Sequence, residues 1–256
     1  MRGASDGTAV RLIGVLRHLA EADGEVTVKG LADALALPPS TAHRMLGQLA
    51  RTGMVEADGA RHRYRPGVEY YRLAALVAGR MDLAEIARPI MDAVVAACGE
   101  TCVLGLYLPG ERRMMFVARA DSAHPLRYPL ALHRPLSVAW GATGRAILAF
   151  LPAAEIDAVL AMREASPATG AALPPAAEMH RRLADIRASG VAVSHGEKIP
   201  GAVGIAAPVL RTGGQAIGSL SVTIPELRFR PGSEARLVDL VRSRAAELSR
   251  ALGAAS

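Results

Sequence analysis

Five polar side chains follow two prolines near the amino end of the chain. They lie in the stretch PPSTAHRMLGQLAR and are Ser40, Thr41, His43, Arg44 and Gln48. An arginine can donate two parallel hydrogen bonds to guanine, a contact worth about 1–3 kcal/mol of discrimination between bases. The hydroxyl, imidazole and amide groups add donors and acceptors to the same surface. These residue types favour recognition of a nucleic acid, with Arg44 as the main candidate for a base contact.

The distribution of charge supports this interpretation. The formal net charge is +6, and no Asp or Glu occurs from Pro38 through Val55. A second basic group, Arg61, His62 and Arg63, follows soon afterwards. Such residues would contact phosphates or enter the minor groove, which adds salt-sensitive affinity with little sequence information. The alternative is that these are ordinary solvated charges on a small α+β domain.

The apolar residues between these side chains indicate how they are positioned. Ala42, Met45, Leu46 and Leu49 recur at helical spacing, so one face of the helix packs and the other stays outside. Pro39 suits the first helical turn, and Ser40 or Thr41 is expected to cap it. Two helices should precede this one, one over residues 10–20 and a second over 28–35 capped by Thr27.

Two short extended stretches, MVEA and RHRYR, flank Asp58-Gly59 and predict a hairpin. Three helices followed by a two-stranded ribbon make a winged helix-turn-helix. In that arrangement the third helix lies in the major groove, and the helix before it crosses the phosphate backbone.

A chain of 256 residues exceeds the usual size of one domain, so we expect a small domain joined to a larger one. The predicted divisions are a winged helix-turn-helix over 1–66, a linker helix over 67–81 and a ligand-binding domain over 82–256. The larger domain should be α+β with an antiparallel or mixed sheet. Its expected strands are 101–108, 114–120, 127–130, 191–195, 204–210 and 216–224, and its expected helices are 83–97, 142–150, 153–162, 176–189 and 233–252.

The larger domain offers the elements of a small-molecule site. Gly141 and Gly144 bracket a helix start whose N–H groups, near Ala142 and Thr143, can receive an anion. The stretch from 194 to 223 supplies hydroxyls from Ser194, Ser221 and Thr223, and Gly204 allows close backbone approach. An apolar pocket for a small organic ligand can be closed by Met115, Tyr128, Leu130, Trp140 and Val203. Taken singly, each hydroxyl is better explained as an exposed strand residue or local cap, and each apolar residue as core.

Catalysis and metal binding are disfavoured. His195 with Glu197 is the tempting acid–base pair, but the chain has no Gly-x-Ser-x-Gly elbow and no His-Glu-x-x-His motif. Cys98 and Cys102 are too few for a structural metal site, and we interpret them as reduced thiols. We expect no cofactor. The chain also has no apolar leader or bilayer-length apolar run, so we expect a cytoplasmic protein without membrane contact.

From about Val10 to Leu252 the chain resembles the IclR family of bacterial transcriptional regulators. The resemblance is carried by LADALALPPSTAHRMLGQLARTGMV with RYRPG, by GATGRAILAFLP, and by IRASGVAVSHGEKIPGAVGIAAPV with SLSVTIP. It implies an amino-terminal domain that binds double-stranded operator DNA, a linker helix, and a GAF-like or profilin-like domain that binds a small metabolite. It also implies homodimers that often pair into dimers of dimers.

The resemblance also implies where a metabolite binds. The family's effector site corresponds to the backbone at Ala142 and Thr143, to Ser194 and Gly204, and to Ser221 and Thr223. Some members that bind small carboxylates have an acidic residue and a cysteine where this chain has Ser194 and Gly204. We expect a roomy site near Gly204 that suits an aromatic or branched organic acid.

Two functions from different classes follow from the sequence. The first is a ligand-responsive DNA-binding regulator of a catabolic or metabolic operon. The second is a small-molecule-binding or metabolite-processing protein whose amino-terminal helices only mediate association. Acidic residues at positions 40–48 would have favoured the second, and the chain has none there.

Overall fold

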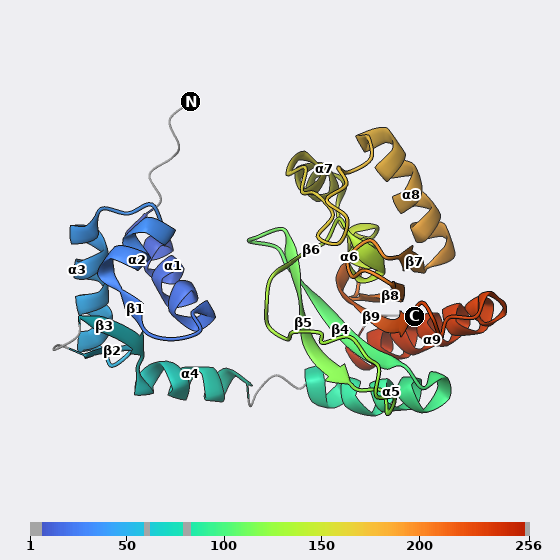
Figure 1. Cartoon of the computed structure of the whole chain (residues 1–256), viewed down its shortest axis with the longest axis horizontal. Helices are drawn as coiled ribbons and strands as arrows, with labels where there is room; N and C mark the ends of the chain where they lie inside the picture. The colour runs from blue at the N-terminus through green and yellow to red at the C-terminus, as the bar shows by residue number, and fades with distance from the viewer. Residues whose placement is uncertain (1–6, 59–61, 79–82, 254–256) are drawn as a thin grey trace. The chain divides into compact units, whose positions relative to one another are not determined.

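The computed structural model describes residues 7–58, 62–78 and 83–253, and the chain divides into two compact units, Met1–Met81 and Asp82–Ser256 (Figure 1). Each unit has its own hydrophobic core. The first unit contains α1 (Thr8–Glu21), β1 (Val26–Thr27), α2 (Val28–Ala34), α3 (Pro39–Arg51), β2 (Val55–Asp58), β3 (Arg63–Pro66) and α4 (Val68–Ala78).

The helices of the first unit form where their apolar stripes predict them. Ala42, Met45, Leu46 and Leu49 of α3 are buried together with residues of α1 and α2. The predicted cap of α2 is confirmed, because the Thr27 hydroxyl accepts a hydrogen bond from the Gly30 N–H at 3.1 Å.

The predicted hydroxyl cap of α3 is wrong. Pro38 is the N-cap residue and no side chain caps the helix. Pro38 and Pro39 lack N–H groups, and the Thr41 N–H donates to the Pro38 carbonyl at 2.9 Å. Only the Ser40 N–H remains to be satisfied in the first turn, so the helix begins without help from Ser40 or Thr41.

The predicted hairpin is present as β2 and β3, with Val55 opposite Pro66 and Asp58 opposite Arg63. Its predicted tip at Gly59 lies outside the described residues, as does Arg61. The structure adds β1, which pairs with β3 to give a three-stranded antiparallel sheet in the order β1-β3-β2. Two residues are too few to produce an alternating pattern, which is why the sequence does not reveal β1.

The second unit is a six-stranded sheet between helical layers, which confirms the α+β class. Neighbouring strands are all antiparallel, in the order β6-β5-β4-β9-β8-β7. Its strands are β4 (Thr101–Leu108), β5 (Arg113–Ala120), β6 (Leu136–Ser137), β7 (Ala192–His195), β8 (Ala202–Leu210) and β9 (Ala216–Pro225). Its helices are α5 (Leu83–Cys98), α6 (Gly141–Leu148), α7 (Ala153–Ala161), α8 (Ala176–Ser189), a short 3-10 turn η1 (Pro231–Ser233) and α9 (Glu234–Ala251).

The two faces of this sheet have different cores. One face packs against α5 and α9, with Met91 and Val241 among its fully buried side chains. The other face packs against α6, α7 and α8 through residues that include Ile147, Val159 and Leu183 (Figure 1). Because side chains alternate along a strand, every second residue of β8 and β9 faces α6.

One predicted strand is wrong. The stretch 127–130 is irregular, and the Leu130 carbonyl accepts a hydrogen bond from Arg119 Nη1 at 2.8 Å instead of joining a ladder. The edge position beside β5 is taken by β6, where Leu136 lies opposite Met114. Alternating apolar residues around Tyr128 and Leu130 look like a short strand, but they serve to cover the α6 face of the sheet.

Candidate nucleic-acid interface and ligand site

The outward face of α3 carries the residues proposed for base contact. Ser40, His43 and Arg44 are exposed, and Thr41 is half-buried. Within the described residues no carboxylate lies within ion-pair distance of Arg44, and no hydrogen bond occupies the Ser40 or Thr41 hydroxyl. Their donors and acceptors are therefore available to a partner.

Gln48 differs from the other four. The residue is half-buried, and its Oε1 atom is enclosed without a hydrogen-bond partner among the described residues. The sequence placed Gln48 fully outside, but its position one turn beyond Arg44 turns part of the amide toward the domain. Gln48 is the weakest of the five candidates for base contact.

The wing is less free than its sequence indicates. Arg63 Nε lies 3.8 Å from a Glu25 carboxylate oxygen, and Arg65 pairs with Glu56 at 2.8 Å. These pairs are exposed, so they are weak and a phosphate can compete for either arginine. His62 is exposed and has a φ of +51° at the turn before β3.

The second candidate site lies where α6 covers the sheet. Alternation along β7, β8 and β9 directs Ser194, Gly204, Ser221 and Thr223 toward α6, as a single shared site requires. Gly141 begins α6 with a φ of +76°, a left-handed conformation that glycine adopts without strain.

A hydroxyl group already satisfies one of the N–H groups at the amino end of α6. The Ala142 N–H donates to Ser194 Oγ at 2.8 Å, and Thr143 Oγ1 lies 3.0 Å from Ser221 Oγ. Ser219 Oγ donates to the Thr143 carbonyl at 2.9 Å. All five residues in these contacts are buried, so the helix start and two strands share one enclosed polar network.

Two of the residues predicted for the pocket lie on the wrong face. Val203 is fully buried in the core under α5 and α9. Met115 lies between Met114 and Phe116, which both pack on the α6 face, so its side chain points to the opposite side. The alternating pattern alone does not tell which of Met114 and Met115 faces α6, because that depends on the register of the strand. A register shift between β4 and β5 makes the assignment harder.

The expected room near Gly204 is also absent. A Cβ at Gly204 would lie 3.2 Å from both Ala142 Cβ and Ser194 Oγ. Glycine at this position lets α6 approach the sheet closely, and the space is filled by protein.

The remaining apolar candidates do share one core. Leu130 and Trp140 are buried with Met114 and Phe116, and Tyr128 packs against them. The Tyr128 hydroxyl donates to the Gly201 carbonyl at 2.5 Å, and Trp140 Nε1 donates to the Glu164 carbonyl at 2.8 Å. They form the apolar wall beside the α6 network.

The suspected acid–base pair is not formed. Glu197 pairs with Arg145 Nη1 at 2.8 Å, and the His195 ring makes an edge contact with Phe229 at 5.7 Å between centroids. The described residues contain no group of three His, Cys, Asp or Glu side chains that could hold a metal ion. Cys98 and Cys102 are free thiols, and burial raises the pKa of each, which makes them poor nucleophiles.

Lys198 is a site residue that sequence reasoning missed. Its stem runs over Gly141, where a Cβ would lie 3.0 Å from Lys198 Cβ. Its Nζ donates to the Ser137 carbonyl at 2.9 Å and lies 3.6 Å from Met114 Sδ. Burial lowers the pKa of Lys198 to about 8, and the Glu164 carboxylate partly opposes the shift. One signal was available: Lys29 and Lys198 are the two lysines of a chain with 30 basic residues.

Comparison with known sequences gives two family matches that cover most of the chain. The profile "IclR helix-turn-helix domain" matches residues 8–59, and "Bacterial transcriptional regulator IclR C-terminal" matches residues 75–250. Among curated proteins, the glycerol operon regulatory protein of Streptomyces griseus is 34% identical over 250 residues, which cover 95% of each chain.

Solved structures show the same fold. An IclR transcriptional regulator of Silicibacter sp. TM1040 aligns with a TM-score of 0.87 at 24% identity, over 97% of each chain. An IclR homologue of Microbacterium hydrocarbonoxydans, solved as a complex with 4-hydroxybenzoate, aligns with a TM-score of 0.76 at 22% identity, over 96% of this chain and 99% of that one. No helix among residues 7–58, 62–78 and 83–253 has the length and apolar character needed to cross a membrane.

Proposed function

The chain belongs to the IclR family of bacterial transcriptional regulators, and from this premise we propose that it binds operator DNA as a homodimer. We propose further that binding of a small organic acid makes the homodimer release the operator or change its arrangement on it. The family is one of DNA-binding regulators and not of enzymes. The proposal that the amino-terminal helices only mediate association therefore loses its basis.

The observation that carries the operator proposal is the outward face of α3. Ser40, Thr41, His43 and Arg44 present free donors and acceptors on a segment without any carboxylate. A polyanion can approach such a surface without like-charge repulsion, and an arginine without an acid partner can form the bidentate contact to guanine. His62 and Arg63, together with Arg61, are proposed to hold phosphates.

The homodimer proposal is supported by exposed apolar side chains on α4. They include Val68, Tyr71 and Val77, with exposed fractions of 72%, 64% and 60%. The Tyr70 hydroxyl donates to the Leu16 carbonyl at 3.3 Å, so the helix is tied to the first unit while these side chains face outward. An exposed apolar patch on a surface helix is typical of a contact between protein chains.

The ligand proposal rests on the α6 network and its apolar wall. One relative regulates a glycerol operon by name and another is bound to 4-hydroxybenzoate, so small metabolites are the expected class. We propose the residues of the α6 face as the effector site: Ala142, Thr143, Ser194, Gly204, Ser221, Thr223, Tyr128, Leu130 and Trp140. The regulated operon is proposed to be a catabolic or metabolic one.

A mobility-shift titration on the promoter region beside the protein's own gene tests the operator proposal. We expect binding at least about 1,000-fold tighter than to random DNA of equal length and salt concentration. Equal affinity for the two DNAs would refute operator recognition by α3.

A further inference from the structure

Among the described residues Lys198 has no acid partner within ion-pair distance, although two ion pairs lie near it. Arg145 pairs with Glu197 at 2.8 Å, and Arg113 pairs with Glu164. Glu164 is the carboxylate that acts on Lys198 most, yet its ion-pair contact is with Arg113 and it lies beyond 4.0 Å from Nζ. Five charged groups therefore gather beside the start of α6 with one positive charge in excess.

Lys198 is half-buried, and the protein partners of its ammonium group are weak. An ammonium group has three N–H donors, and within the described residues Nζ meets one carbonyl, of Ser137, and one thioether, of Met114. Thioether sulfur is a poor acceptor, and a charge partly removed from water without a counter-ion is costly. A bound anion would supply the missing counter-charge.

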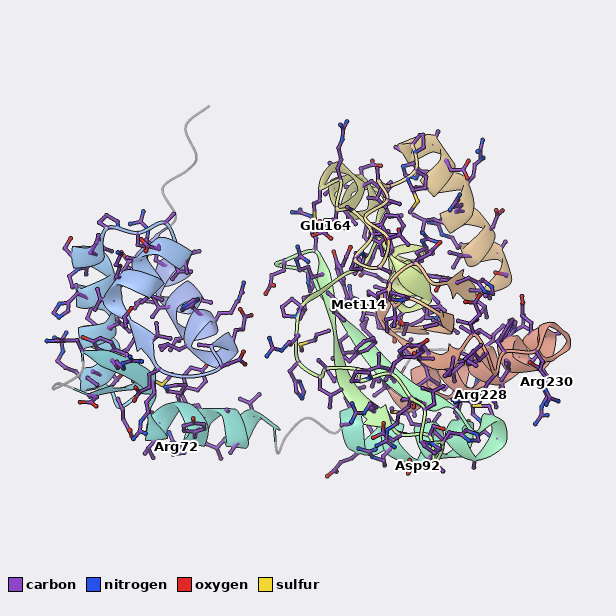
Figure 2. All side chains as sticks on the ribbon, in the orientation of Figure 1. Arg72, Asp92, Met114, Glu164, Arg228 and Arg230 are labelled. Atoms are coloured by element: carbon purple, nitrogen blue, oxygen red, sulfur yellow. The ribbon has the colours of Figure 1, made fainter. Side chains whose placement is uncertain are left out.

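The position of Nζ indicates where the anion would lie. Met114 Cε and Thr143 Cγ2 would lie 3.1 Å and 3.0 Å from a Cβ at Gly105, so these two side chains meet over a strand residue without a side chain of its own. Met114 belongs to β5, and its side chain is buried on the α6 face of the sheet; Figure 2 labels it together with Glu164 in the second unit. A carboxylate that reaches Nζ would require Met114 to rotate, which its unbranched side chain permits.

We propose that Lys198 is the carboxylate-binding residue of the effector site, and that the effector is an organic acid whose carboxylate displaces the Met114 thioether from the ammonium. This inference rests on the proposed function, because it assumes that the α6 face binds the effector. The start of α6 favours the same charge, since helix amino ends attract anions. The charge of Lys198 thereby determines whether the site selects acids over their neutral analogues.

The two lysines of the chain allow a direct test. We would label the full-length protein with [13Cε]lysine and assign its two resonances with Lys29→Arg. Benzoate, 4-hydroxybenzoate and pyruvate would be titrated separately, with benzamide and 4-hydroxybenzamide as neutral counterparts. We expect at least one acid to shift the Lys198 resonance and raise its pKa, with Lys29 unchanged. A Lys198 resonance that none of the three acids moves would overturn the inference.

Binding measurements on variants give a second readout. Lys198→Met keeps the length of the side chain and removes the charge, and Lys29→Met is the matched control. We expect Lys198→Met to weaken acid binding by about 10- to 100-fold in calorimetry while leaving amide binding unchanged. Equal acid affinity in both variants would overturn the role of Lys198.

The same variants separate this inference from the proposed function. Without ligand, Lys198→Met should bind the operator fragment as tightly as the unmodified protein, because position 198 is not in the DNA-binding unit. If the unmodified protein fails to select the operator but its Lys198 resonance responds to an acid, the regulator proposal fails and the lysine assignment stands. If the operator is bound and the acids leave Lys198 unaffected, only the lysine assignment fails.

Discussion

Arg44 and Arg63 are both exposed arginines of the first unit, but their surroundings differ. Arg44 has no carboxylate within 4.0 Å among the described residues, whereas Arg63 lies 3.8 Å from Glu25. Arg44, which has no acid partner, can bind one base directly. Arg63 must leave the Glu25 carboxylate before it can bind a phosphate. This difference gives the two residues separate roles, which mutation can distinguish.

We predict that Arg44→Ala weakens operator binding by about 1–3 kcal/mol with little effect on random DNA. Arg63→Ala should weaken binding to both DNAs and reduce the salt slope by about 1, because it removes one phosphate contact. Fluorescence anisotropy at several salt concentrations measures both quantities. Equal losses on operator and random DNA for Arg44→Ala would contradict its role in base contact.

Lys198 predicts a pH dependence of stability. Its pKa falls from 10.5 in an unfolded chain to about 8 in the folded protein because burial disfavours the charged form. Between these values the unfolded state binds more protons, so the free energy of unfolding should rise with pH. Urea unfolding from pH 7.5 to 10 should show this rise in the unmodified protein, and Lys198→Met should lack that contribution. Parallel pH profiles for the two proteins would contradict the burial of the charge.

A residue's position could be predicted when it depends on its own helix, and not when it depends on segments far away in the chain. The outward position of Arg44 follows from the buried stripe on its own helix, so the sequence was sufficient. Met115 and Val203 were assigned to the wrong face because strand register depends on partners far away in the chain. Lys198 was missed because its significance comes from the absence of an acid near Nζ, and only the folded structure shows that.

The start of α3 illustrates how an element can free its side chains. Two prolines remove backbone donors that would otherwise need a cap, so the hydroxyls of Ser40 and Thr41 are unused within the described structure. The start of α2 is the opposite case, since Thr27 binds the Gly30 N–H. One threonine serves the fold and the other is available to DNA.

A matched pair of substitutions tests this contrast. Thr27→Ala should lower the free energy of unfolding of the first unit by about 1 kcal/mol, because it removes a cap. Thr41→Ala should leave stability within about 0.5 kcal/mol and weaken operator binding. Urea unfolding and anisotropy on the same preparations measure the two effects. A loss of stability in Thr41→Ala that matches the loss in Thr27→Ala would refute the interpretation.

Elements with a long periodic pattern were predicted well, and short ones were not. The bounds of α8 and β4 agree with the expected 176–189 and 101–108. By contrast β1 and β6 have two residues each and were not predicted, while the irregular stretch at 127–130 was taken for a strand. A two-residue strand is defined by its pairing with a neighbouring strand, and the local sequence does not indicate which strand that is.

At the scale of the whole chain, we propose that the first unit recognises DNA and the second unit binds the effector. The first unit ends at Met81 and therefore includes α4, and we propose that α4 acts as linker and dimer contact. Two copies joined through α4 would present two α3 helices to the half-sites of one operator. A ligand in the second unit would then act by changing the population of competent arrangements of the pair.

If α4 forms the dimer contact that we propose, Leu76→Lys combined with Val77→Lys should convert the proposed dimer to a monomer. Both side chains are exposed in the protomer, at 47% and 60%, so the fold should remain intact. Operator affinity should fall by about 100-fold or more because the two half-sites are no longer bound together. Sedimentation equilibrium gives the oligomeric state, and circular dichroism serves as the folding control. A variant that stays dimeric would place the interface elsewhere.

The hydrogen bond from the Ala142 N–H to Ser194 Oγ has a consequence for sensitivity. A metabolite that takes this N–H must first displace an internal hydroxyl, so the energy gained is the small difference between two similar bonds. Occupancy of the proposed effector site would then change only over the concentration range in which the metabolite accumulates, and trace amounts would leave the site empty. The chain would in this way respond to a large supply of the metabolite and ignore its background level.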